Sequence, residues 1–123
     1  MKRLALHVSG FTLALLFVSF AVQAQTAYPT KPITLVSAFA AGGDSDLSAR
    51  NLAQHAQKYL NNQAIVVLNR VGASGQIGSM AVHNAPADGY TLLAARIATH
   101  AILPAMDTKT PYKWGDFTII SLL

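Results

Sequence analysis

Two glycine-containing segments are the parts of this sequence whose residue types suit ligand chemistry. They read Phe39-Ala40-Ala41-Gly42-Gly43-Asp44-Ser45-Asp46 and Arg70-Val71-Gly72-Ala73-Ser74-Gly75-Gln76-Ile77-Gly78. Glycine lets the backbone approach a ligand closely, and the free N–H groups at a helix start attract anions. The pattern therefore favours reversible binding of an anion. A plain turn is the competing interpretation of the first segment, with Asp46 paired to Arg50 one helical turn later.

A third segment adds a cation, because Arg96 lies between a predicted strand and His100. Its guanidinium can donate a forked pair of hydrogen bonds to a carboxylate, although a solvated arginine explains the position almost as well. His55 and His83 are expected to face solvent. No HExxH motif, Walker loop or nucleophile elbow is present, so we predict no metal, no cofactor and no hydrolytic catalysis.

An oxidoreductase is the main alternative from another class of protein. The spacing of Gly72, Gly75 and Gly78 resembles the dinucleotide fingerprint of some short-chain dehydrogenases. Residues 69–71 separate the predicted strand from the first glycine, and no acidic residue follows at the distance expected for a ribose contact. The sequence therefore favours binding over redox chemistry.

Hydrophobic periodicity predicts the elements that must position these segments. We expect strands at 33–39, 64–68, 90–95 and 117–123, and helices at 45–60, 75–84 and 100–106. The inward-facing residues are expected to be Ala49, Leu52, Ala53, Ala56, Tyr59 and Leu60 in the first helix, and Ile77, Met80 and Ala81 in the second. Alternating strands and helices indicate an α/β fold with an open, largely parallel sheet and flanking helices. In such folds ligands bind at the carboxyl ends of the strands, where all three segments fall.

Composition limits the classes of function. The chain has 123 residues, 52% of them hydrophobic, which suits at most one small domain. Of its nine basic residues, two lie at the extreme N-terminus and the other seven are scattered singly. Nucleic-acid binding needs clustered cations and is not expected. The chain has no cysteine, which excludes disulfides and thiolate metal sites.

The N-terminus has the layout of a secretory signal. Lys2 and Arg3 precede a charge-free apolar stretch at 4–21, and Val22-Gln23-Ala24 suits a signal peptidase. We predict a signal peptide at 1–24, a mature chain from Gln25 and a periplasmic location. An uncleaved membrane anchor is the alternative, since about 20 apolar residues can cross a bilayer.

The series of motifs along residues 28–117 resembles the substrate-binding proteins of tripartite tricarboxylate transporters, the TctC or Bug family. The matching stretches are Tyr28 to Ile33, Phe39 to Gly43 with Asp46, Asn69-Arg70 with Gly72-Ala73 and Gly75 to Gly78, Pro86 to Leu93, Thr99 to Pro104, Pro111-Tyr112 and Asp116-Phe117. Departures from the family pattern occur at Ala38, Asp44, Val71, Arg96-Ile97 and Ile119.

The resemblance implies a two-lobed periplasmic receptor that passes a small organic acid to a transporter's membrane subunits. Residues 25–123 would form part of its N-terminal lobe, and an inactive truncated remnant is a further alternative. Gly42, Gly43 and Ala73 would present backbone donors, and Asp46 would organise the first loop. The full set of expected ligand-binding residues is Phe39, Ala41, Gly42, Gly43, Asp46, Gly72, Ala73, Ser74 and Arg96.

Overall fold

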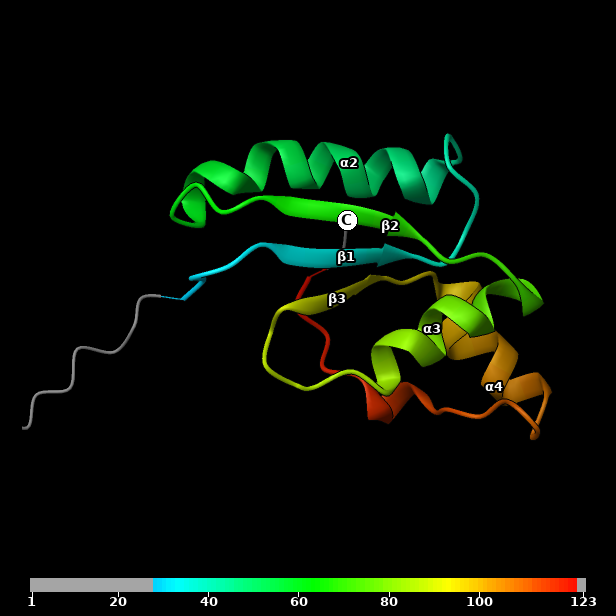
Figure 1. Cartoon of the computed structure of the whole chain (residues 1–123). Coiled ribbons are helices and arrows are strands. Elements are labelled where there is room, and N and C mark those ends of the chain that lie inside the picture. Colours follow the sequence, from blue (N-terminus) through cyan, green and yellow to red (C-terminus); the bar gives the residue numbers. More distant parts are fainter. Residues whose placement is uncertain (1–27, 122–123) are drawn as a thin grey trace, which may run out of the picture.

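The computed structural model describes residues 28–121 and shows three parallel strands between helices (Figure 1). The predicted signal peptide, residues 1–24, lies outside the described residues. Within the described part of the chain, no helix is long and apolar enough to span a bilayer.

The sheet has the order β2-β1-β3, with β1 at Ile33–Ser37, β2 at Ile65–Asn69 and β3 at Thr91–Ala94. Both neighbours run parallel to β1. The central strand β1 is almost entirely buried, which accounts for its nearly continuous apolar sequence. The prediction of an open parallel α/β sheet is confirmed.

Helices cover both faces of the sheet (Figure 1). α2, at Asp44–Ala56, continues into a 3₁₀ turn at Gln57–Tyr59. α3, at Gln76–His83, follows a short turn at Ala73–Gly75 and lies on the other face from α2. Ala49 and Ala53 are the buried apolar positions of α2, so a narrow stripe of small side chains contacts the strands.

Three side chains predicted to face inward are exposed: Leu52, Tyr59 and Ile77. The cause in α3 is a close approach of the backbone to the sheet. A Cβ atom on Gly78 would stand 2.8 Å from the Cα of Ala38, so this helix packs through Gly78 and the buried Ser79. Helix periodicity identified both helices, but the packing of α3 through Gly78 and Ser79 leaves Ile77 exposed.

The segment after β3 differs from its prediction. A π-helical turn at Ala98–Ile102 leads into α4 at Leu103–Met106, in place of a single short helix. After a 3₁₀ turn at Trp114–Asp116, residues 117–121 form no strand, so the prediction of a fourth strand at 117–123 is wrong for the part that the structure describes. The segment is held instead by Phe117, whose ring contacts His100 and Tyr112.

Candidate functional site

The three loops that follow the strands meet at one edge of the sheet. We define loop 1 as residues 38–43, loop 2 as 70–75 and loop 3 as 95–97. Ser37 at the end of β1 pairs with Asn69 of β2 and with Ala94 of β3. Because the strands are parallel and end in register, their carboxyl ends bring the loops together.

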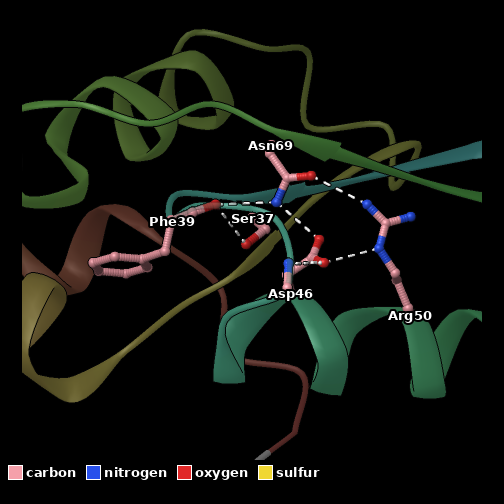
Figure 2. Close-up of polar contacts among 6 residues, drawn as sticks. Ser37, Phe39, Asp46, Arg50 and Asn69 are labelled. Atoms are coloured by element: carbon pink, nitrogen blue, oxygen red, sulfur yellow. Dashed lines mark hydrogen bonds and ion pairs between the residues drawn. The ribbon is translucent and has the colours of Figure 1, made fainter.

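A buried carboxylate, Asp46 in the first turn of α2, organises loop 1 (Figure 2). One carboxylate oxygen, Oδ2, accepts hydrogen bonds from the Gly42 backbone N–H at 2.8 Å and from Arg50 Nε at 2.9 Å. The other, Oδ1, accepts one from Asn69 Nδ2 at 2.8 Å. The i,i+4 pair of Asp46 with Arg50 is thus present, and the same carboxylate also fixes Gly42.

These donors determine the charge state of Asp46. The side chain of Arg50, then the Gly42 N–H, then Asn69 lower the pKa of this carboxyl well below its ordinary range, against the opposing effect of burial. Asp46 is therefore ionised throughout the neutral and mildly acidic range. A charge held by three donors inside the fold orients loop 1 and is not free to take up or release protons.

Asn69 joins two loops and was not among the expected site residues. Its Nδ2 donates to Phe39 O at 3.0 Å as well as to Asp46, and its Oδ1 accepts from Arg50 Nη2 at 3.2 Å (Figure 2). The sequence interpretation named Asn69 as part of a family motif and as a spacer before Gly72, but gave it no role in the site. It is the last residue of β2. Its polar side chain at the carboxyl end of an apolar strand was the signal that could have identified it.

Loop 2 is fixed by an unusual backbone. Four successive residues, Gly72, Ala73, Ser74 and Gly75, have φ angles of +141°, +45°, +53° and +93°. The left-handed region costs a residue with a side chain roughly 1–2 kcal/mol, so Ala73 and Ser74 carry strain that the surroundings must offset. Strain of this kind concentrates at functional sites, which supports the prediction of a ligand loop here.

The glycines of the dinucleotide alternative have packing roles. Gly75 precedes α3, and a Cβ there would meet Thr99 and Phe39 at 3.1–3.2 Å. A Cβ on Gly78 would meet Ala38 and the Arg70 carbonyl at 2.8 Å. Close packing against loop 1, loop 2 and the π-helical turn accounts for these two glycines without a nucleotide.

Loop 3 is joined to the first turn of α2 through Arg96. Its Nη2 donates to Asp44 Oδ2 at 2.6 Å, and its Nε donates to the hydroxyl of Ser45. The guanidinium carbon lies 5.0 Å from the centroid of the Phe39 ring. Arg96 was expected to offer a free pair of guanidinium donors to a ligand, but it is already bonded to the Asp44 carboxylate of this chain.

The residues after loop 3 also contact loop 2. Thr99 Oγ1 donates to Ser74 O at 3.3 Å, and the buried Tyr112 donates its hydroxyl to Thr99 O at 3.0 Å. His100, stacked on Tyr112, is buried, and this burial lowers its pKa although the Arg96 carbonyl opposes the shift. His55 and His83 are exposed, as predicted.

The expected ligand-binding residues therefore gather at one edge but differ in accessibility. Asp46 is buried, and Phe39, Gly72 and Arg96 are partly exposed. The residues that present open surface are Ala41, Gly42, Gly43, Ala73 and Ser74. Across residues 28–121, no group of three histidine or acidic side chains is placed to hold a metal ion. The expectation that Gly42 and Gly43 offer free backbone donors is wrong, because their N–H groups are donated to Asp46 and to the Ala40 carbonyl. The geometry suits contact through the Ala73 N–H and the open backbone surface of loops 1 and 2.

Solved structures with similar folds are periplasmic binding proteins. A periplasmic transporter superposes with a TM-score of 0.67 at 42% identity, over 72% of this chain and 29% of the other. MatC from Rhodopseudomonas palustris, solved with bound malate, gives 0.70 at 34% identity, over 74% and 31%. An R. palustris protein solved with adipate gives 0.57 at 39% identity, over 60% and 24%.

The sequence comparisons identify the family. Residues 48–123 match the tripartite tricarboxylate transporter family receptor, TctC. BugT of Bordetella pertussis is 41% identical over 109 residues, which are 88% of this chain and 33% of that protein. The chain belongs to the TctC family, as its motifs predicted. It spans about a third or less of the length of the first curated relatives it matches.

Proposed function

We propose that this chain supplies loops 1–3 of a periplasmic receptor that reversibly binds a small organic acid. One observation carries the proposal. Loops 1 and 2 present exposed glycine and alanine backbone at the same edge of the sheet, held there by the Asn69 contacts to Phe39 and Asp46. The family and the malate-bound and adipate-bound neighbours support a carboxylate as the ligand.

The proposed mechanism is binding without covalent chemistry. Ala73 donates its backbone N–H to the ligand carboxylate, and Phe39, Ala41, Gly72 and Ser74 shape the site around it. Gly42 and Gly43 contribute open backbone surface, because their N–H groups are already donated to Asp46 and to the Ala40 carbonyl. Backbone donors select for negative charge without requiring a metal or a bound cofactor. Asp46 contributes indirectly, because its hydrogen bond from Gly42 orients loop 1.

The finer parts of the proposal concern the whole protein. The signal peptide at 1–24 directs export, and residues 25–123 belong to the N-terminal lobe of a two-lobed receptor that closes on its ligand. The loaded receptor then delivers the acid to the membrane subunits of a tripartite transporter. N-terminal sequencing of the exported protein tests the first step, with Gln25 as the expected first residue.

Calorimetry on the full-length protein tests binding. We expect heat of binding from at least one acid in a panel of malate, adipate, citrate and glutamate, and none from NAD. A response to NAD alone would reject the receptor and favour the oxidoreductase that Gly72, Gly75 and Gly78 suggested. No response to any of these compounds would favour an inactive remnant.

A pair of matched substitutions tests the location of the site. Ala73→Asp adds a negative charge on loop 2, at a φ angle that aspartate tolerates better than most residues. Ala87→Asp adds the same charge at an exposed position before β3, near the opposite edge of the sheet. We expect the first to weaken acid binding by about tenfold or more, through like-charge repulsion at close range, and the second by less than about twofold. Equal losses of acid affinity in the two variants would show that the ligand does not bind beside loop 2.

A further inference from the structure

The ion pair between Arg96 and Asp44 connects loop 3 to the first turn of α2, and its two partners are held very differently. Arg96 has three contacts: Asp44, the Ser45 hydroxyl and the Phe39 ring. The Asp44 carboxylate accepts its one described hydrogen bond from Arg96, and the Asp44 side chain is 87% exposed. Loss of Asp44 would therefore leave the arginine in place, whereas loss of Arg96 would leave the Asp44 side chain free.

We infer that the Asp44 carboxylate occupies the place on Arg96 that a ligand carboxylate takes in the bound receptor. Arg96 is then the residue that makes the receptor prefer dicarboxylates over monocarboxylates. This inference rests on the proposed function. The exposed backbone of loops 1 and 2, with the Ala73 N–H as donor, takes one carboxylate of the ligand. The second carboxylate then displaces Asp44 from Arg96.

The geometry of the guanidinium favours such an exchange. Nε is used by Ser45 and Nη2 by Asp44, and within residues 28–121 no group accepts a hydrogen bond from Nη1. A carboxylate that replaces Asp44 can use Nη1 and Nη2 together, which is the bidentate arrangement that arginine favours. Arg96 is 40% exposed, so a solute has access to it.

The strength of the existing pair also favours exchange. Ion pairs between exposed side chains contribute little net stability, because solvent screens them and both side chains lose freedom. Asp44 is therefore a weak competitor that lowers the affinity for every dicarboxylate by a modest factor. It also keeps Arg96 neutralised while the site is empty.

The test uses the full-length protein and a matched pair of ligands. The pair consists of the dicarboxylate that the wild type binds and the same molecule with one carboxylate replaced by methyl, such as adipate with hexanoate or malate with 2-hydroxybutyrate. Calorimetry on the wild type, Asp44→Asn, Arg96→Gln and the double variant gives the affinity ratio within the pair. Asp107→Asn, an exposed aspartate beyond α4, is the control for net charge.

We expect Asp44→Asn to tighten dicarboxylate binding about two- to fivefold, the range that an exposed ion pair is worth, and to change monocarboxylate binding less than about twofold. Arg96→Gln should weaken dicarboxylate binding about tenfold and spare the monocarboxylate, because a charge-assisted pair is lost. In the double variant the gain from Asp44→Asn should disappear, and Asp107→Asn should resemble the wild type.

Three results would overturn the inference while leaving the receptor intact. One is an equal loss for both ligands in Arg96→Gln, which would make Arg96 a support for loop 3 only. Another is unchanged or weaker dicarboxylate binding in Asp44→Asn. The third is an undiminished gain in the double variant, which would make Asp44 a simple repelling charge. Failure of the wild type to bind any acid would instead reject the proposed function, and this inference with it.

Discussion

Loop 1 and loop 2 occupy the same edge of the sheet but are held by opposite means. Loop 1 is organised by a side chain, since the buried Asp46, in the first turn of α2, accepts a hydrogen bond from the Gly42 N–H. Loop 2 is organised by its own backbone, with four successive φ angles in the positive range. The difference shows that a loop at the ligand-binding edge can be positioned either by a buried charge or by a strained backbone that tight packing maintains.

The largest expected effect comes from Asp46→Asn, which tests whether the charge of Asp46 holds loop 1 in place. Three donors surround the carboxylate, so an asparagine in either amide orientation directs an NH₂ group at one or more of them. We expect the thermal midpoint to fall by roughly 10 °C or more, measured by circular dichroism. Asp107→Asn, at an exposed position, should change it little.

The same variant has a pH signature. The pKa of Asp46 is lowered in the folded protein, so its stabilising contribution is complete above the unfolded value of about 3.8 and is lost as pH falls towards the folded value. Asp46→Asn should lack that component of the acid dependence. Parallel acid-unfolding curves for the wild type and the variant would show that the charge of Asp46 is unimportant.

A smaller effect is expected from Gly78→Ala, which tests the packing that supports loop 2. The added Cβ would stand 2.8 Å from Ala38 and from the Arg70 carbonyl, so either α3 or loop 2 must shift. We expect a loss of about 1–3 kcal/mol in the free energy of unfolding, measured with urea. Gly115→Ala is the matched control, because nothing lies within 4 Å of a Cβ at Gly115. A loss at Gly115 equal to that at Gly78 would refute the packing explanation.

The smallest expected effect, and the one with opposite sign, comes from Ala73→Gly. Glycine removes the cost of a side chain at a φ of +45°, so we expect a gain of about 0.5–1 kcal/mol in the free energy of unfolding. Ala41→Gly, in loop 1, has no positive φ to relieve and should lose stability slightly through the freer unfolded chain. An equal gain in the free energy of unfolding from Ala41→Gly would show that backbone strain does not distinguish loop 2 from loop 1.

Much of the fold followed from local patterns. The continuous apolar run before Phe39 predicted a strand covered on both faces, and β1 is that strand. The β-branched run before Asn69 predicted β2, and the pair Gly42-Gly43 marked the break after the first strand. Parallel strands with intervening helices then required the loops to share an edge, which the register of Ser37 with Asn69 and Ala94 confirms.

The errors have a common physical origin. Ile77 was assigned inward and residues 117–123 to a strand because both are apolar, and apolar character does not specify a packing partner. Ile77 is displaced outward by the close approach of Gly78 to Ala38, and Phe117 packs on His100 and Tyr112 instead of extending the sheet. The contacts of Gly78 with Ala38 and of Phe117 with His100 are not local in sequence.

The sequence by itself determined the order of the three strands and the two helices between them, the identity of the two glycine-containing loops and the family. Only the tertiary structure decided that Asn69 bonds to Asp46 and Phe39, that Arg96 bonds to Asp44, and that Ala73 and Ser74 are strained. The reason is distance along the chain. Periodicity and turn chemistry act over a few residues, whereas these contacts join residues 23 to 52 positions apart. The strain at Ala73 and Ser74 persists only within the packing that folding assembles around it.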